Sequence, residues 1–266
     1  MNLTLNGTIE TDFQSINKLI DINNALSKAN FLEECVIDMT RVTWFNAALC
    51  SFYKAFLRQC ILDKGLRIIF KLNQSIQDIF YRNGFINGEV QDIHDTIFPV
   101  KDFRISAIET FLKEMKHDFV QNSNKFPFPA EFTRDIQKSL GEIFSNSQIH
   151  SGADWVYTSG QFFPAKEKIT FCITDTGIGI VNKIKQKFDN IESKSAIDWA
   201  FGEGNTTKIG FGGLGLFELK KKVEERGGEL IIVSNDTYYN VLTGVAKKFQ
   251  FDFKGTSAIV TLSCKG

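Results

Sequence analysis

The 266-residue sequence lacks paired cysteines, an excess of charge of either sign and long hydrophobic runs. None of its five cysteines forms a CxxC pair, so we expect reduced core thiols rather than disulfides or a structural metal site. Lys and Arg together number 31, as do Asp and Glu, so the net charge is zero. This balance does not indicate binding to nucleic acid or to an anionic membrane surface. No apolar run approaches the ~18 residues of a spanning helix. The first residues also lack a signal-peptide pattern, so we expect a cytoplasmic protein.

The remaining composition is that of a globular protein. Hydrophobic residues make up 43% of the chain and charged residues 23%, and the length suits one large domain or two ordinary ones. Phenylalanine is abundant, with 26 copies, and we expect a Phe-rich core because large apolar side chains are usually buried. A Phe-lined partner surface is the alternative.

Residues 1–90 alternate between predicted strands and helices. Short apolar runs predict strands, and apolar residues at helical spacing predict helices. The strands are expected at 3–9, 35–40 and 66–72, and the helices at 13–29, 46–65 and 74–85. Strands separated by helices favour a mostly parallel or mixed sheet with helices against it.

Part of this N-terminal segment resembles a known domain family. Residues 36–57 and 68–85 are similar to the strand, loop and helix segments of STAS domains, the α/β modules of anti-sigma factor antagonists and anion transporters. Where the antagonists carry Asp-Ser-Ser-Gly with a phosphoacceptor serine, this chain has Asn-Ala-Ala-Leu at Asn46–Leu49, and Ser51 lies further into the helix. The resemblance therefore implies a STAS-like docking or regulatory domain over 1–92, without a phosphorylated switch.

Residues 93–130 are predicted to be a helical connector between two domains. The segment 92–103 is expected to be irregular, with Pro99 as a breaker, and 105–119 has helical spacing. From 131 onward a long helix, several strands and a further helix near 213–226 predict helices on one face of a mixed sheet.

The predicted helix 131–150 carries three polar residues at steps of four, Glu142, Asn146 and His150. This spacing puts them on one helix face. An Asn carbonyl suits the Mg²⁺ of a bound ATP, which takes few protein ligands. A Glu one turn earlier can polarise a water or hydroxyl toward the γ-phosphate, and the His can touch phosphate or pack beside the site. An amphipathic helix with solvated polar residues explains the same spacing.

A second motif follows the predicted strand 168–174. Asp175 at its end can accept the amino hydrogen of adenine, while Gly177 and Gly179 let the backbone approach the base without a Cβ. Thr256, which opens the last strand, can add its hydroxyl to this group. The alternative is an ordinary tight turn, in which two glycines and an acid are common.

A third motif is a glycine cluster. Gly210, Gly212, Gly213 and Gly215 lead into a predicted helix, whose first N–H groups suit phosphates. Lys208 precedes the cluster and can either reach the phosphates or remain solvated. The Walker A pattern GxxxxGK[ST] is absent.

In this order the motifs resemble the N box, the two glycine boxes and the final Gly255-Thr256 motif of the GHKL superfamily, whose ATPases share the Bergerat fold. The resemblance covers 131–266 and is greatest to anti-sigma factor serine kinases. It implies an α/β sandwich that binds ATP and Mg²⁺, with Glu142 as the catalytic base and Asn146 as the metal ligand. The other implied ATP contacts are His150, Asp175, Gly177, Gly179, Lys208, Gly210, Gly212, Gly213, Gly215, Leu216 and Thr256.

ATP binding alone leaves the activity open. One hypothesis is an ATPase or a serine/threonine kinase that acts on a partner in bacterial signalling, with a homodimer compatible with either. A second is an ATP-sensing module that recruits a protein through the STAS-like domain. A third is a histidine kinase with His117 as phosphoacceptor, but the Arg and Pro expected after that residue are missing.

Overall fold

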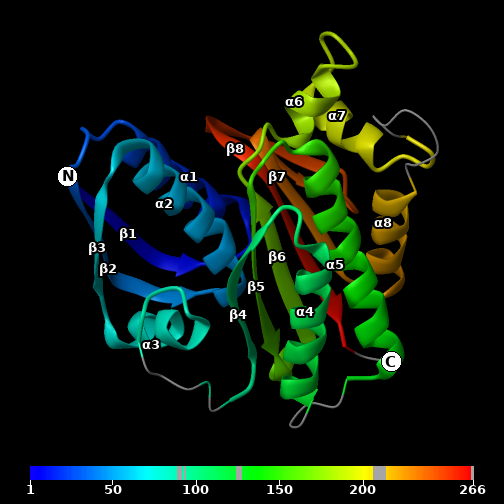
Figure 1. The fold of residues 1–266 in the computed structure, drawn as a ribbon, viewed down its shortest axis with the longest axis horizontal. Helices are drawn as coiled ribbons and strands as arrows, with labels where there is room; N and C mark the ends of the chain where they lie inside the picture. Colours follow the sequence, from blue (N-terminus) through cyan, green and yellow to red (C-terminus); the bar gives the residue numbers. More distant parts are fainter. Residues whose placement is uncertain (89–91, 93, 124–127, 206–213, 265–266) are drawn as a thin grey trace.

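The computed structural model describes residues 1–88, 92, 94–123, 128–205 and 214–264. Figure 1 shows an α/β protein with two separate sheets. The strand order of the first is β1 (Asn2–Ile9), β2 (Glu34–Phe45) and β3 (Arg67–Leu72), and that of the second is β4 (Ile97–Arg104), β5 (Trp155–Phe163), β6 (Lys168–Asp175), β8 (Val245–Ser263) and β7 (Glu229–Asn240). The α/β class predicted from the sequence is confirmed. We call the part from β1 to α3 (Gln74–Asn83) the N-terminal module and the part from β4 to β8 the C-terminal module.

The N-terminal module is a parallel sheet with helices packed against it, as the alternation of strands and helices predicts. Asp12 and Asn73 each accept a hydrogen bond at the start of a helix, and Gly65 ends another helix at φ 65°. The elements are β1 (Asn2–Ile9), α1 (Phe13–Ser27), β2 (Glu34–Phe45), the 3-10 turn η1 (Ala47–Leu49), α2 (Cys50–Lys64), β3 (Arg67–Leu72) and α3 (Gln74–Asn83).

The C-terminal module contains a sheet in which every neighbouring pair of strands is antiparallel. The prediction of a mixed sheet is wrong here. Strands β5 and β6, and likewise β7 and β8, follow each other through short connections, which join neighbours in antiparallel fashion. The elements are β4 (Ile97–Arg104), α4 (Ile108–Ser123), α5 (Ala130–His150), β5 (Trp155–Phe163), η2 (Pro164–Lys166), β6 (Lys168–Asp175), α6 (Ile180–Lys185), α7 (Ser193–Ala200), α8 (Gly215–Glu225), β7 (Glu229–Asn240) and β8 (Val245–Ser263).

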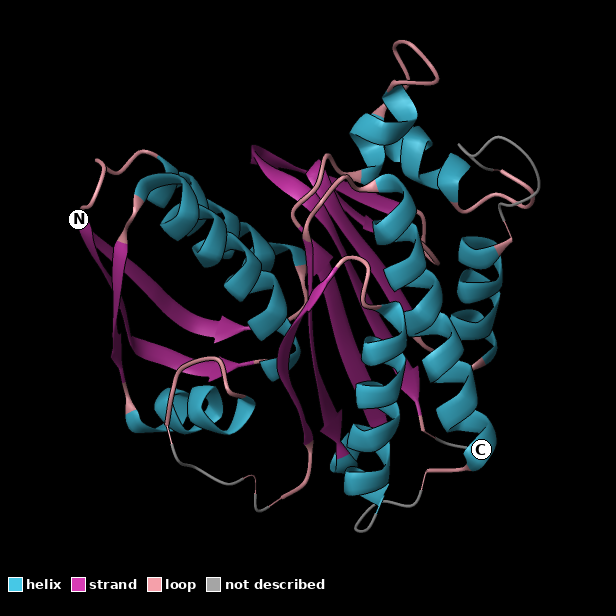
Figure 2. Cartoon of the chain, viewed as in Figure 1, coloured by secondary structure: helices cyan, strands magenta, loops and turns pink. Residues whose placement is uncertain are grey.

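Strand β4 lies where the sequence predicts an irregular segment, 92–103. It is the edge strand beside β5, and its register shifts between Phe98 and Lys101, around Pro99. A proline has no N–H to donate, so it is tolerated on an edge strand or at a bulge, and it did not exclude a strand here. The segment 93–130, predicted as a helical connector, thus adds a strand and helix α4, which packs on α5 (Figure 2), to the C-terminal module.

The five-stranded sheet is covered on both faces (Figure 1). Helices α4, α5 and α8 lie over one face, and the N-terminal module lies against the other. Side chains alternate along β6, so that Phe171 and Ile173 join the core beneath the helices while Cys172 joins the core shared with the N-terminal module. Most of the largest fully buried side chains are phenylalanines, as the composition predicts. None of the helices in the described ranges is both long and apolar enough to cross a bilayer.

The two modules are joined by hydrogen bonds at the start of α2. Ala47 N donates to Gln161 Oε1 at 2.9 Å, and Ser51 N donates to Ser159 Oγ at 2.8 Å. Ser51 Oγ donates to the carbonyl oxygen of Cys172 at 2.9 Å. The first turn of this helix is therefore buried against β5 and β6 of the other module.

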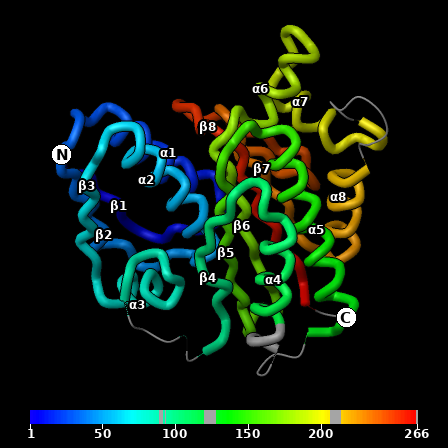
Figure 3. Tube along the Cα trace, viewed as in Figure 1, coloured from blue at the N-terminus to red at the C-terminus, as the bar shows by residue number. Residues whose placement is uncertain are grey.

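A second contact between the modules comes from the long β7–β8 hairpin, whose end reaches α1 (Figure 3). Phe13 of α1 stacks on Phe249 with ring centroids 5.1 Å apart and meets Tyr238 edge-on at 5.8 Å. The N-terminal module is thus held at two separated places on the reverse face of the sheet.

Candidate functional site

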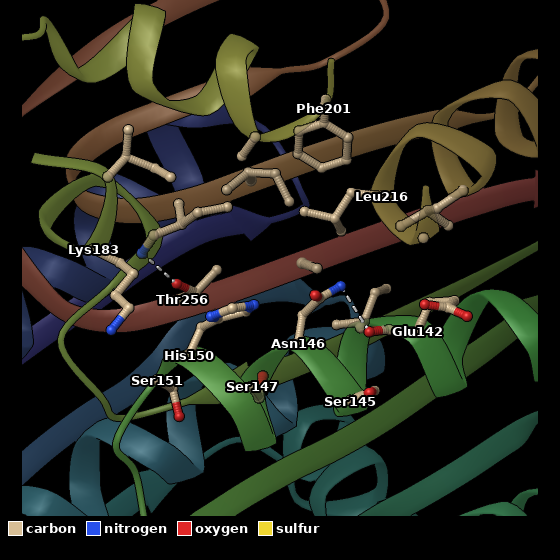
Figure 4. A pocket seen from close by; sticks show the side chains of 18 of the residues that line it. Glu142, Ser145, Asn146, Ser147, His150, Ser151, Lys183, Phe201, Leu216 and Thr256 are labelled. Atoms are coloured by element: carbon tan, nitrogen blue, oxygen red, sulfur yellow. Dashed lines mark hydrogen bonds between the residues drawn. The ribbon is translucent and has the colours of Figure 1, made fainter. Parts of the chain in front are cut away.

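A cavity of about 300 Å³ opens on the helix-covered side of the five-stranded sheet. Its walls come from α5, the turn after β6 together with α6, the end of α7, the start of α8 and strand β8. The volume lies at the lower end of the ~300–1,000 Å³ that small-molecule pockets occupy. Figure 4 shows the side chains that project into it.

The predicted row on α5 lines this cavity. Glu142, Asn146 and His150 all contribute to its wall, as their spacing predicts (Figure 4). Helix α5 turns apolar residues such as Ile136 and Phe144 into the core, which leaves this row toward the cavity. Glu142 and His150 are two turns apart, about 12 Å along the helix axis.

The amide of Asn146 has a fixed orientation. Its Nδ2 donates to the carbonyl oxygen of Glu142, one turn back, at 2.9 Å. Its Oδ1 accepts no hydrogen bond from any residue that the structure describes. The amide oxygen is therefore the atom that this side chain offers to a cation or donor in the cavity.

Asp175 forms the floor of the cavity and is only 2% exposed. Its Oδ1 accepts from Gly177 N at 3.0 Å and from Thr256 N at 3.3 Å, and its Oδ2 accepts from Ser147 Oγ at 2.9 Å. Burial raises the pKa of the Asp175 carboxyl above its ordinary value, and these hydrogen bonds oppose the shift. The side chain is an oriented acceptor in a desolvated place.

The turn after Asp175 needs its glycines. A Cβ on Gly177 would lie 2.1 Å from Ser151 O, and a Cβ on Gly179, at φ 83°, would lie 2.4 Å from Asn235 Oδ1. Gly179 lines the cavity, whereas Gly177 packs against the end of α5 outside it. Thr256 Oγ1 accepts from Ile180 N at 3.0 Å, so it caps the start of α6 beside the cavity.

The start of α8 closes the other end of the cavity through Gly215 and Leu216. A Cβ on Gly215 would lie 2.1 Å from Glu142 Oε2, so this carboxylate lies directly against the helix start. The side chain of Leu214, the residue before α8, makes no hydrogen bond to the first turn of this helix. The first N–H groups of a helix have no partner within the helix itself.

Four predicted site residues lie outside the described residues: Lys208, Gly210, Gly212 and Gly213.

Sequence reasoning missed several residues of the site. Ser147 donates a hydrogen bond to Asp175 from the buried side of α5. A small polar residue on an otherwise apolar helix face was the sequence signal that could have identified it. Lys183 lines the cavity from α6 (Figure 4). Two further residues of this helix, Ile180 and Ile184, line it as well. Phe201, which follows α7, belongs to the same wall. No sequence motif pointed to Lys183 or Phe201.

The cavity is lined by both polar and apolar side chains. Its apolar lining residues are Ile143, Ile180, Ile184, Trp199, Ala200, Phe201, Leu214, Leu216, Leu219, Ile232 and Ala258. Apolar walls with a few oriented polar groups suit a flat aromatic ring that carries a hydrogen-bond donor.

No protein-family model matches this chain, and no curated protein matches it. In the described ranges, no group of three or more His, Cys, Asp or Glu side chains is arranged to hold a metal ion.

Proposed function

We propose that the cavity binds Mg²⁺-ATP and that the C-terminal module is a Bergerat-type ATP-binding domain of the GHKL kind, preceded by a STAS-like module. The observation that carries the proposal is the buried Asp175 carboxylate on the floor of an apolar cavity whose wall also bears Asn146 and Glu142. Three sequence motifs far apart in the chain contribute to this one cavity.

The floor can pair with the amino group of adenine. Asp175 is held by two backbone N–H groups and one hydroxyl, so its carboxylate keeps its orientation without a ligand. Such a group accepts a hydrogen bond from the amino group of adenine. A guanine base placed in the same pose would bring its carbonyl oxygen against this acceptor, and a buried acceptor left without a donor costs free energy.

Other residues of the cavity suit phosphates and a metal ion. Asn146 offers its Oδ1 to Mg²⁺, which prefers oxygen ligands and takes few of them from protein. The first turn of α8, which receives no cap from the side chain of Leu214, offers N–H groups to phosphate oxygens. Bound Mg²⁺-ATP would supply an electrophilic γ-phosphoryl group, and Glu142 is the side chain that can take a proton from an attacking water or hydroxyl.

These roles are compatible with an ATPase or with a serine/threonine kinase that acts on a protein partner in bacterial signalling. A histidine kinase fits less well. His117 is exposed on α4, and this helix packs on α5 within its own module instead of standing apart as a dimerisation helix.

The second candidate function is an ATP sensor that recruits a partner. The observation that favours it is the set of hydrogen bonds from the start of α2 to β5 and β6, because β6 also carries Asp175. Asn46–Leu49, at the start of α2, is buried, so a partner of the N-terminal module would have to contact another part of its surface.

The proposal is tested by titration calorimetry with ATP, ADP and GTP, with and without Mg²⁺. Asn146→Ala is expected to lose the Mg²⁺-dependent part of ATP affinity while the protein stays folded. Gln148→Ala is the matched control, because this amide is exposed on the same helix and does not line the cavity. Unchanged affinity in Asn146→Ala, or no ATP binding by the unmodified protein, would refute the assignment.

The reaction is tested with γ-labelled ATP. Release of free phosphate would identify an ATPase, and label on a partner protein would identify a kinase. Binding without release, in the presence of candidate partners, would identify the sensor.

A further inference from the structure

A small buried polar cluster lies directly behind the candidate nucleotide site. Ser257 Oγ is 2.8 Å from Thr174 Oγ1 and 3.2 Å from Cys172 Sγ, and all three residues are fully buried. They lie on the face of β6 and β8 that is turned away from the cavity, since side chains alternate along a strand. The next residues along these strands, Asp175 and Thr256, are paired with each other and face the cavity.

The N-terminal module completes this cluster. Ser51 Oγ donates to Cys172 O at 2.9 Å, and Ser51 N donates to Ser159 Oγ at 2.8 Å. Ser159 Oγ in turn donates to Ala48 O at 2.7 Å. The residue before α2 provides no side-chain cap of its own, so the first turn of this helix is capped from the other module.

We propose that the first turn of α2 is a positioning element for the nucleotide site, acting through Ser51 and the Cys172–Thr174–Ser257 cluster on Asp175 and Thr256. The inference rests on the proposed function for the identity of the ligand. Ser51 is a positioning residue, because it touches β6 from behind and does not line the cavity.

The energetics of buried hydrogen bonds give this arrangement its effect. Each hydroxyl in the cluster has partners that would lose a hydrogen bond if it were removed, and a buried polar group left unpaired costs free energy. Burial raises the pKa of the Cys172 thiol, so the sulfur stays neutral beside the hydroxyls. Loss of Ser51 Oγ therefore loosens the pairing of β6 with β8 where Asp175 accepts from Thr256 N. Thermodynamic reciprocity then requires bound nucleotide to tighten the start of α2.

The test compares Ser51→Ala with Ser15→Ala. Ser15 is also a buried serine at the start of a helix in the N-terminal module, but its hydrogen bonds stay within that module. The first readout, without nucleotide, is hydrogen exchange at the amides of Gly177 and Thr256. We expect Ser51→Ala to speed this exchange on the order of fivefold or more, and Ser15→Ala to leave it unchanged at a similar loss of global stability.

The second readout is ligand-dependent. Mg²⁺-ATP is expected to slow exchange of the Ser51 amide in the unmodified protein and to bind Ser51→Ala on the order of fivefold more weakly. The amide of Ser15 should not respond. A purely structural role for Ser51 would move global stability without this reciprocal protection.

A second pair of variants serves if Ser51→Ala does not fold. Ser257→Ala removes the hydroxyl pair behind the site, and Thr261→Val removes the equivalent pair with Thr170, 2.9 Å apart, at the far end of the same two strands. We expect Ser257→Ala, but not Thr261→Val, to speed hydrogen exchange at the amides of Gly177 and Thr256. Equal exchange within either matched pair would overturn the inference. Failure of the unmodified protein to bind ATP would instead refute the proposed function, and the exchange comparison without nucleotide would still decide the positioning role.

Discussion

Asp175→Asn separates the binding role of this residue from its role in the fold. The substitution preserves shape, and the remaining Oδ1 can still accept from Gly177 N and Thr256 N. The new amide nitrogen faces Ser147, whose hydroxyl can turn to accept instead of donate. The network around the turn is thus retained, while the buried charge and the second acceptor disappear.

Asp175→Asn should weaken ATP binding but should not destabilise the fold. Replacing an acceptor by a donor opposite the amino group of adenine removes a hydrogen bond to a charged group, worth about 2–3 kcal/mol, or roughly 30- to 150-fold in affinity. Stability moves the other way. The folded-state pKa of Asp175 is raised, so its charge destabilises the fold above that pKa and the penalty fades as the pH falls through it. Asp175→Asn should therefore be at least as stable as the unmodified protein at pH 7, with the difference shrinking toward acid pH.

The assays are titration calorimetry with Mg²⁺-ATP and thermal unfolding between about pH 5 and pH 8, the range in which native proteins are usually most stable. Asp102→Asn is the control, because the pKa of Asp102 is shifted in the opposite direction from that of Asp175. Burial alone would raise the pKa of Asp102, but Lys54 and Arg58 outweigh it and hold the pKa below its usual value. This variant should lose stability at pH 7 and keep ATP affinity. Normal ATP affinity in Asp175→Asn would refute the assignment of the cavity, and a large loss of stability at pH 7 would refute the account of its desolvated charge.

Three further results are expected. Glu142→Gln should bind ATP but release γ-phosphate on the order of 10²- to 10⁴-fold more slowly, and negligible release by both forms would favour the sensor. Gly177→Ala should lower the free energy of unfolding in urea by about 1–3 kcal/mol, because its Cβ would lie 2.1 Å from Ser151 O; an unchanged urea midpoint would contradict this geometry. Lys183 lines the cavity, and its ammonium group can pair with a phosphate, so Lys183→Met should weaken ATP binding by about 1 kcal/mol, roughly fivefold. Lys185→Met, which alters an exposed lysine of the same helix, should not. Equal affinities in these two variants would exclude Lys183 from phosphate binding.

Sequence patterns predicted the features that depend on residues close together in the chain. The order of strands and helices in 1–90 follows from periodicity and caps, and the row Glu142, Asn146 and His150 follows from helix geometry. Strand β4 escaped prediction because Pro99 is tolerated only at a sheet edge, and the sequence does not say which strand will be the edge.

Tertiary contacts decided the rest of the site. Ser147 and Lys183 acquire their positions from the packing of α5 and α6 over the sheet, which no spacing in the sequence records. Lys208 and the glycines before Gly215 lie outside the described residues, and their phosphate role stays a prediction, as do the STAS and GHKL resemblances.

The hydrogen bonds that the C-terminal module makes to the first turn of α2 have a consequence for the order of folding. Ser51 precedes its partner Ser159 by 108 residues and its partner Cys172 by 121 residues. During synthesis the first half of the chain emerges before these partners exist, so the first turn of α2 lacks these hydrogen bonds until β5 and β6 have left the ribosome. We therefore expect a fragment that ends before β5 to expose apolar surface and aggregate, and the native helix to form in step with the sheet that caps it.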